Sequence, residues 1–443
     1  MSMMTDMASP NAEHALDAAC CRFLQGALDA VAQATGSRDT PRRLRRACTW
    51  RPTGPGSLTS NTIERQVVDD GLLWEIVGDR LGAEPVWRET SDAVGCYLAE
   101  KKVGPILFMG DDPEYLYMKP LVSRYVARYS TLAFSQSNAQ SEIDRMKREL
   151  SLPSLPLVGS LYLERFGAAH PFRLQGHVVF RPITGEELFE LGCRCEQAGG
   201  HMGSALCPRE DAWICQATLN DGRGTSGGMG RMQALLGDNV PAALRMFKNG
   251  DVSVTSTGWR WDCHYGTMAF GLGGHSFGLA HGQPEYSLSA GEIVRLQRFW
   301  AKFRPIAEAP NHYLQAPLRR LRTAGTRTAG MDAIVDYVIA LEALLTSKSE
   351  SQSELGYRFR LRGALLCAGK REDRRDWLDK LRTLYELRSS IVHGRVIEDD
   401  DLREALPIAE KALRTIWRWY FAGFSDKQDN GDGVQKIDRL LLS

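Results

Sequence analysis

The sequence predicts an α+β fold in which a mixed α/β N-terminal domain is followed by an all-α helical bundle. Short β-type runs alternate with helical patterns over residues 61–286, whereas helical periodicity continues with few interruptions from residue 287 onward. The chain of 443 residues is long enough for two or three domains, and its 43% hydrophobic and 25% charged residues are typical of a globular protein.

Composition and charge exclude several classes of protein. No apolar run approaches the roughly 20 residues that cross a bilayer, so we expect no membrane partner. The first residues carry acidic groups before any basic one and contain no apolar signal-peptide core. Ten cysteines are too few for a disulfide scaffold, and a net charge of +1 means that any nucleic-acid surface must be a local patch. We therefore expect a cytoplasmic protein with reduced thiols.

Residues 1–60 are expected to be peripheral. An Ala-rich helix over 12–34 precedes the basic run RDTPRRLRRA at 38–47. We interpret this run as a solvated linker, and contact with nucleic acid is the less favoured alternative.

The mixed domain at 61–286 is expected to sense or recruit another molecule. Thr184 and Glu187 have the spacing of a capping box and predict a helix start, while strands and tight turns are expected over 258–282. Four segments have the composition of strands: PILFM (105–109), HVVF (177–180), AWICQATL (212–219) and DVSVTST (251–257). These patterns predict no particular topology.

The helical region covers 287–425, with a core at 330–425. Ser289 and Glu292 form a capping-box pattern that predicts a helix through about 303. Further helices are expected over 332–347, 354–369, 371–393 and 402–424. Their short connections favour antiparallel packing into a bundle.

Three boundaries of this region follow from local signals. Ser351 and Glu354 are expected to cap the helix that follows them. We interpret 322–330 as a linker and 426–443 as a flexible tail.

Arg388 and His393, in RSSIVHG (388–394), are the residue types that metal-free cleavage of RNA requires. The arginine can neutralise a crowded phosphate, and the imidazole can move a proton near neutral pH. They stand five residues apart at the end of an apolar helical stripe, with Gly394 as a natural helix stop. The alternative is that both are ordinary solvated residues at a helix end.

A similar spacing occurs twice more in the chain. Arg165 and His170 run straight into Pro171, which predicts a turn. The stretch from Arg194 to His201 passes through Gly199 and Gly200, which argues against a continuous helix.

Helical geometry restricts how the pair can act. Residues five apart point about 140° away from each other, so Arg388 must reach around the helix to share a phosphate with His393. Ser389 lies four residues before His393 and could orient the imidazole. Tyr385, one turn before Arg388, is expected to pack in the core, with stacking on a base as the alternative.

Charged residues around the pair suggest further roles. Glu342 lies within an apolar helix, where an isolated carboxylate is costly, so we favour a structural ion pair with Arg362 or Arg388 over a place in the site. Cations that could form an RNA-binding track are Arg358, Arg360, Arg362, Lys370, Arg371, Arg374 and Arg375. The acidic run EDDD at 398–401 partly cancels them.

Three segments occur in an order that resembles a known family: DYVIALEALL (336–345), FRLRGALL (359–366) and YELRSSIVHG (385–394). With ALRMFKNGDV (243–252) and YSLSAGEIVRL (286–296) before them, they are similar to the Apea-like HEPN domain, over about 330–425. The resemblance implies a helical bundle that forms a homodimer and cleaves RNA without metal or cofactor, through Arg388 and His393. Members of this group are linked to bacterial defence against phage by growth arrest.

The family pattern has a polar residue after the arginine, and Ser389 occupies that position here. Several members carry Asn, Asp or His there, and some have lost activity. The alternative function is therefore a catalytically silent HEPN module for dimerisation or RNA binding. In either case the N-terminal domain would be regulatory, with an unknown trigger.

The implied chemistry suits these residues. RNA supplies its own nucleophile, the 2′-OH. The protein must therefore position this hydroxyl, remove its proton and stabilise the charge that develops on the phosphate. His393 would take the 2′-OH proton or deliver one to the 5′-oxygen, and Arg388 would bind the phosphorane charge. A twofold dimer would bring two such pairs together as base and acid, leaving a 2′,3′-cyclic phosphate and sparing DNA.

Two other groups of residues could form a metal site or a nucleotide site, and neither interpretation is favoured. Cysteine and histidine ligands suited to zinc occur at Cys193, Cys195, His201 and Cys207, with Cys215, Cys263 and His264 as possible additions. Their spacing matches no known zinc finger, so we favour buried free cysteines. GRGTSGG (222–228) fits G-x-G-x-x-G, but neither a βαβ unit nor the acidic residue of a dinucleotide site is evident, so we favour a mobile surface loop.

Overall fold

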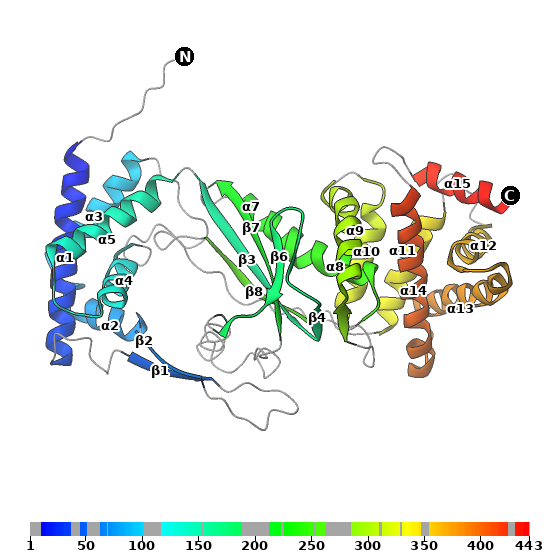
Figure 1. Cartoon of the computed structure of the whole chain (residues 1–443), viewed down its shortest axis with the longest axis horizontal. Coiled ribbons are helices and arrows are strands. Elements are labelled where there is room, and N and C mark those ends of the chain that lie inside the picture. Colours follow the sequence, from blue (N-terminus) through cyan, green and yellow to red (C-terminus); the bar gives the residue numbers. More distant parts are fainter. Residues whose placement is uncertain are drawn as a thin grey trace, which may run out of the picture.

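The computed structural model of this chain describes residues 10–36, 45–50, 63–68, 70–101, 117–152, 154–185, 187, 212–222, 226–250, 253–261, 285–309, 312–327, 330–346, 354–423 and 430–442. They form three parts that follow one another along the long axis: a group of helices, a central β-sheet and a second group of helices (Figure 1). The predicted α+β fold class with a helical C-terminal region is confirmed.

The N-terminal part is a group of helices with an apolar core of its own. The helices described in this part are α1 (Pro10–Thr35), α2 (Asp70–Leu81), α3 (Pro85–Glu100), α4 (Lys119–Tyr129) and α5 (Gln136–Ser151). α1 packs against the other four and buries Leu16, Phe23 and Leu28 completely. The helix predicted over 12–34 is confirmed, but its peripheral position is wrong, because its apolar side chains form the centre of this core.

The basic run at 38–47 ends in a strand. β1 (Arg45–Trp50) pairs antiparallel with β2 (Ile63–Val68). The interpretation of the whole run as a linker is therefore wrong for its last residues, and 38–44 lie outside the described residues.

The central sheet has the strand order β5-β6-β7-β3-β8, and all of its described pairings are antiparallel. Its strands are β3 (Ser154–Glu164), β5 (Phe172–Leu174), β6 (Val178–Pro182), β7 (Trp213–Gly222) and β8 (Ser253–Trp261). Alternate residues of β3, such as Leu155, Leu157 and Leu163, are buried on one face, as the twofold period of a strand requires. A short parallel pair, β4 (Phe166–Ala168) with β9 (Tyr286–Leu288), lies beside this sheet.

Most of the predicted strands are confirmed. The segments expected at 177–180, 212–219 and 251–257 form β6, β7 and β8. The segment expected at 105–109 lies outside the described residues, as does most of 258–282, where β8 continues to Trp261.

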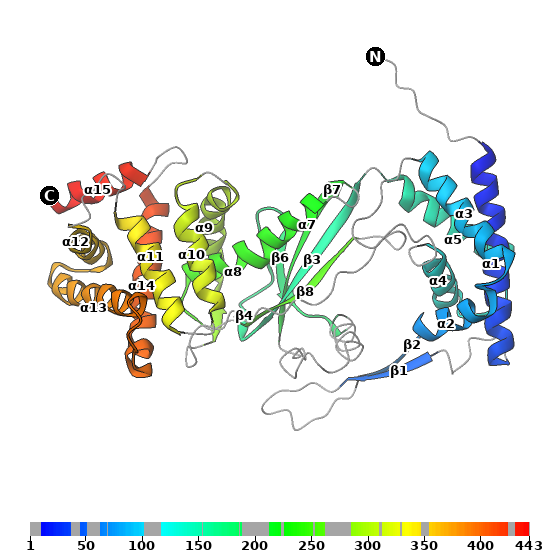
Figure 2. The same cartoon turned by 180° about the vertical axis from the view of Figure 1, so that it is seen from behind.

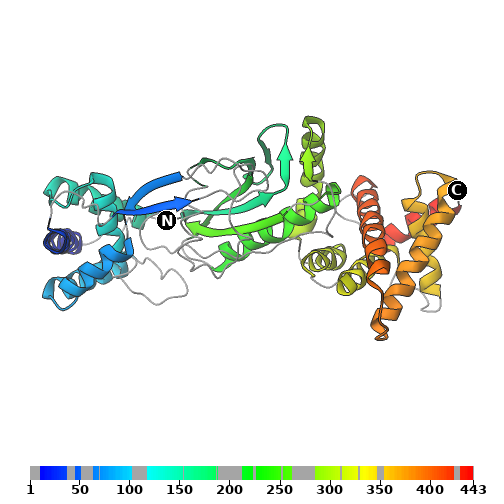
Figure 3. The same cartoon turned by 90° about the horizontal axis from the view of Figure 1, so that it is seen from below.

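A continuous helical segment connects β7 with β8 and covers one face of the sheet (Figures 2 and 3). It consists of α7 (Ser226–Met232), the π-helical η4 (Gln233–Asn239) and α8 (Val240–Phe247). β7 and β8 are both antiparallel to β3, which lies between them, so strand, helix and strand form a split β-α-β unit.

The C-terminal part is helical. Its elements are α9 (Ala290–Glu308), α10 (Gln315–Thr326), α11 (Gly330–Leu345), α12 (Leu355–Cys367), the 3₁₀ turn η6 (Arg371–Asp373), α13 (Arg374–Val392), α14 (Asp399–Gly423) and α15 (Asn430–Leu442). The two predicted capping boxes that lie within the described residues are confirmed, at Ser289 with Glu292 and at Thr184 with Glu187. The helices expected over 332–347, 354–369, 371–393 and 402–424 are present within a few residues of those bounds.

Three predicted boundaries of this part are wrong. α10 continues to Thr326, inside the expected linker, because its apolar face packs on α11. Glu354 does not cap α12, since its carboxylate accepts hydrogen bonds from Arg358; Ser351 lies outside the described residues. The expected flexible tail contains α15, which buries Val434 and Ile437 against the bundle.

The sheet and the C-terminal helices share one apolar core, which also corrects the predicted domain boundary at 286. Trp300 of α9 is fully buried, and its Nε1 donates to the carbonyl of Gln175 at 2.9 Å. Tyr286 of β9 donates its hydroxyl to the carbonyl of Leu244 in α8 at 2.8 Å. The break between cores lies near residue 152, so the helices at 70–151 belong with α1 and the sheet belongs with the bundle.

Candidate functional site

α13 ends at the residues that the sequence singled out. His393 is its C-cap, and Gly394 follows with φ of 76°, a conformation that favours glycine. The Gly394 N–H donates to the carbonyl of Ile391 and the Arg395 N–H donates to that of Ser390, each at 3.0 Å, which is the Schellman pattern. The predicted helix stop at Gly394 is confirmed.

Arg388 occupies an inward-facing position of this helix. Leu381 and Leu384 are buried, and Arg388 follows Leu384 by four residues on the same face. Its side chain is 30% exposed, and its Nε is buried without a hydrogen-bond partner in the described part of the chain. The packing of α13 thus holds the stem of Arg388 and leaves its Nε donor unfilled in the described part of the chain.

Glu342 of α11 is the acidic neighbour of Arg388. Its Oε2 lies 3.8 Å from Nη2 of Arg388, and its side chain is 26% exposed. Burial raises the pKa of Glu342, and the positive charge of Arg388 opposes this rise. The expected structural ion pair is confirmed with Arg388, whereas Arg362 pairs with Asp438 of α15 instead.

His393 is exposed at the end of α13. Its backbone N–H donates to the carbonyl of Ser389 at 3.1 Å, so the chain is still helical there. Within the described residues no hydrogen bond joins the Ser389 hydroxyl to the imidazole, and the expected orienting role of Ser389 stays a prediction. An exposed imidazole is accessible to a substrate from solvent.

Tyr385 packs against α12. Its ring centroid lies 5.6 Å from that of Phe359, which is fully buried. Its ring also lies against Gly356, where a Cβ atom would come within 3.4 Å of the Tyr385 ring. The core-packing interpretation of Tyr385 is confirmed.

The expected cationic track divides into exposed and buried residues. Arg371, Arg374 and Arg375 are exposed around the start of α13. Arg358 is partly exposed and pairs with Glu354 within α12. Arg362 does not belong to this surface: it is 2% exposed, and the carboxylate of Asp438 and the carbonyl of Leu345 accept its donors. The expectation that Arg362 contacts RNA is therefore wrong for this fold.

Exposed apolar side chains lie next to His393. Val392 is 56% exposed and Val396 is 92% exposed, on either side of the helix end. Tyr357, near the start of α12, is 60% exposed. The exposure of these residues was not predicted, because helical periodicity alone does not show which apolar residues near the end of α13 face solvent.

The competing constellations gain no support. Cys193, Cys195, His201 and Cys207 lie outside the described residues, and the described residues contain no cluster of three metal-ligating side chains. Cys215 is fully buried in β7, as expected for a free cysteine of the core.

The Gly-rich segment at 222–228 spans a strand end and a helix start. β7 ends at Gly222 and α7 begins at Ser226, so the interpretation as a surface loop is wrong for its last residues. A dinucleotide site needs adjacent parallel strands, and all described pairings of β7 are antiparallel.

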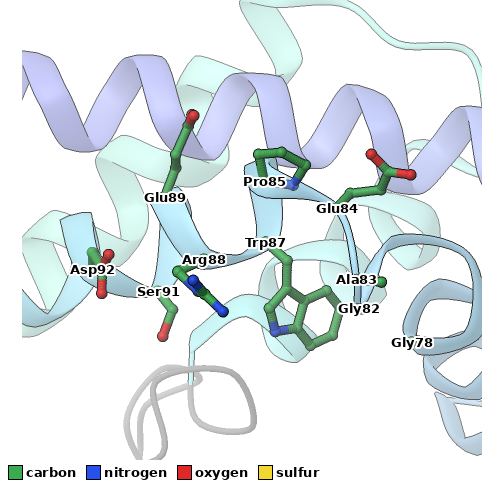
Figure 4. A pocket seen from close by; sticks show the side chains of 10 residues that line it. All are labelled: Gly78, Gly82, Ala83, Glu84, Pro85, Trp87, Arg88, Glu89, Ser91 and Asp92. Atoms are coloured by element: carbon green, nitrogen blue, oxygen red, sulfur yellow. The ribbon is translucent and has the colours of Figure 1, made fainter.

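A depression of about 720 Å³ lies at the corner between α2 and α3 (Figure 4). Trp87 and Arg88 line it, while Glu89 points toward α1 and pairs with Arg22 at 3.1 Å. This corner is at the opposite end of the molecule from α13 (Figure 1), so it contributes nothing to the site of Arg388 and His393.

Comparisons with known proteins found no matching family, no similar curated protein and no similar solved structure. Among the described residues, no helix is long and apolar enough to cross a membrane.

Proposed function

We propose that this chain is a metal-independent endoribonuclease of the HEPN type, in which Arg388 and His393 act on the scissile phosphate. The observation that supports this best is the state of Arg388. Its stem is packed in the bundle, its Nε is unpartnered in the described part of the chain, and its one ion pair, to Glu342, is long at 3.8 Å. A cation that is fixed in position and still has a free hydrogen-bond donor can bind a phosphate with little reorganisation.

The roles of the two residues follow from their chemistry. Arg388 offers a planar fork of donors that fits phosphate oxygens. The exposed His393 would take the proton of the 2′-OH or return one to the leaving 5′-oxygen. The products would be a 2′,3′-cyclic phosphate and a free 5′-hydroxyl. Growth arrest during phage infection is the role proposed for such cleavage.

A second copy of the chain completes the proposed site. One protomer provides a single His393, whereas the reaction uses both a base and an acid. The exposed side chains of Val392 and Val396 beside it suit a self-complementary contact across a twofold axis. Val392→Glu with Val396→Glu should give a monomer in light scattering and abolish cleavage. Val294→Glu, at an exposed apolar position of α9, is the matched control that should change neither.

Cleavage of a labelled pool of total RNA and tRNA in EDTA tests the catalytic proposal. Wild type should cut, leaving cyclic-phosphate ends, and Arg388→Ala and His393→Ala should each lose about 100-fold or more in rate. Arg382→Ala on the exposed face of α13 and His170→Ala near the sheet are matched controls that should remain active. Equal rates for all five proteins would reject the Arg–His site.

A catalytically silent RNA-binding module is the second candidate, favoured by one observation. The Glu342 carboxylate lies beside Arg388, where it would repel a phosphate and compete for the guanidinium. RNA binding that weakens in Arg388→Ala, together with no cleavage by wild type, would support this function and reject the nuclease.

A further inference from the structure

Charged and polar side chains lie deep in the core where α14 packs against both α8 and α11. Arg245 of α8 is 5% exposed and Tyr337 of α11 is 1% exposed. Glu410 and Arg414 of α14 are 7% and 9% exposed. This junction belongs to the core that the sheet shares with the bundle, and is separate from the end of α13.

The only carboxylate among these four residues is already engaged. Oε1 of Glu410 forms an ion pair with Nη2 of Arg414, one helical turn away, at 2.9 Å. Nε of Arg414 donates to the backbone carbonyl of Arg245 at 2.8 Å. Arg414 is therefore satisfied, and Glu410 serves as its counter-ion.

Arg245 has no such partner. Its Nε and Nη2 are both buried, and neither has an acceptor within the described parts of the chain. These two nitrogens form the side-on edge of the guanidinium, the same edge that Arg362 uses to bind both oxygens of Asp438 at 2.7 and 2.8 Å. A buried guanidinium without a counter-ion is strongly unfavourable, because its charge loses the solvation of water.

Tyr337 presents a second unfilled donor. Its hydroxyl is buried and has no hydrogen-bond partner among the described residues. Burial raises the pKa of Tyr337 to about 12, and the positive charge of Arg245 opposes this rise, so the hydroxyl keeps its proton. Nε1 of Trp417, on the same face of α14 as Glu410 and Arg414, is a third buried donor without a partner.

We infer that the side-on edge of Arg245, with the hydroxyl of Tyr337, binds a small oxoanion of the phosphate class within the junction of α8, α11 and α14. The unfilled nitrogens of Arg245 and Trp417 can only donate, and the Tyr337 hydroxyl can also donate, so one acceptor can satisfy several of these groups. The side-on edge of an arginine is matched by two oxygens on one centre. RNA is not the source of this phosphate, because a strand cannot reach a side chain that is 5% exposed. The inference does not depend on the proposed nuclease activity.

Thermal unfolding of the full chain in graded inorganic phosphate tests this site. Ionic strength is held constant with a bulky organic salt, and a parallel series uses chloride. The Tm of wild type should rise with the logarithm of phosphate concentration, by about 2 °C or more over the series, since a ligand that binds only the folded state stabilises it. Equilibrium dialysis with radiolabelled phosphate should give one equivalent per chain.

Three variants separate a bound anion from a purely structural arginine. Arg245→Met should lose the phosphate dependence and, in phosphate-free buffer, unfold at or above the Tm of wild type, because an uncompensated charge is removed. Arg245→Lys keeps the charge without the fork and should lose most of the dependence. Tyr337→Phe, which should fold because it keeps the ring, should weaken phosphate binding several-fold.

The outcomes are decisive in both directions. A phosphate-dependent Tm that disappears in the Arg245 variants and persists in Arg382→Ala supports the site. A wild-type Tm that is insensitive to phosphate, an equal response to phosphate and chloride, or an undiminished response in Arg245→Lys overturns it.

Discussion

The carboxylate of Asp438 receives two hydrogen bonds from Arg362, from Nε at 2.7 Å and from Nη2 at 2.8 Å. Arg362 is 2% exposed within α12, whereas Asp438 belongs to α15, the last helix of the chain. The pair fastens α15 to the bundle, and Nη1 of Arg362 also donates to the carbonyl of Leu345 at the end of α11. One buried side chain therefore joins three helices.

Asp438→Asn should destabilise the protein by about 2–3 kcal/mol, because it leaves the buried charge of Arg362 without a counter-ion. The value is below that of a fully buried pair, since the Asp438 side chain is 43% exposed. Urea denaturation of the full chain would measure it. Arg439→Ala, at the exposed neighbouring position, is the control, and equal stability of the two variants would contradict a fastening role.

Glu292 should make stability depend on acid pH. The ion pair with Lys248 at 2.9 Å, with hydrogen bonds from Ser289, lowers the pKa of Glu292 to about 2. Its contribution is complete above the ordinary pKa of 4.5 and is lost as pH falls through the folded-state pKa of about 2. Glu292→Gln should cost about 1–2 kcal/mol at neutral pH and almost nothing well below pH 2, as measured by urea denaturation across pH. Glu285→Gln, at an exposed site, should show no such pattern.

Glu342→Gln should strengthen RNA binding if Arg388 binds phosphate. The variant removes the carboxylate that competes for Nη2 of Arg388. An exposed or half-exposed ion pair is worth about 0.5–1 kcal/mol, so we expect roughly two- to fivefold tighter binding. Filter binding in a His393→Ala background avoids cleavage during the measurement. Weaker binding would instead show that Glu342 positions Arg388 for its ligand.

A fragment of residues 153–443 should fold cooperatively, and one of residues 285–443 should not. The first keeps the whole core shared by the sheet and the C-terminal helices, whereas the second uncovers Trp300 and the faces of α9 and α14 that pack on α8. Circular dichroism on heating and dye binding to exposed apolar surface would distinguish them. A sharp transition for 285–443 alone would contradict a shared core.

The core shared by the sheet and the C-terminal helices also determines how regulation of the proposed nuclease should be tested. Restraint by the first part of the chain should be examined by removing residues 1–152, because this cut falls between the two cores. Higher RNA cleavage by the 153–443 fragment than by the full chain is the result expected of restraint.

Local signals predicted two of the helix ends of this fold correctly. Ser289 with Glu292 predicted the start of α9, and Gly394 predicted the end of α13, because capping depends on neighbours in the sequence. Helix α15 was missed, since Val434, Ile437 and Asp438 are stabilised by residues of other helices. Short-range sequence patterns do not show which residues of other helices will contact a segment.

The site was predicted in part for the same reason. The periodicity of α13 places Arg388 on a helix that ends at His393, and the structure agrees. Which arginine pairs with Glu342 was left open, because the answer depends on how α11 packs against α13. The unpartnered Arg245 lies in an apolar stretch of sequence, yet only the packing of three helices shows that it lacks a counter-ion.

The single core that runs from the sheet into the C-terminal helices also bears on inheritance. A segment whose apolar side chains are buried by another segment cannot be exchanged between proteins by itself, because separating the two would expose the apolar core that they share. Recombination that preserves folding is therefore expected near residue 152, where few apolar contacts cross, and not at 286. Related chains should accordingly carry the sheet and the bundle as one inherited block, with freely varying N-terminal partners.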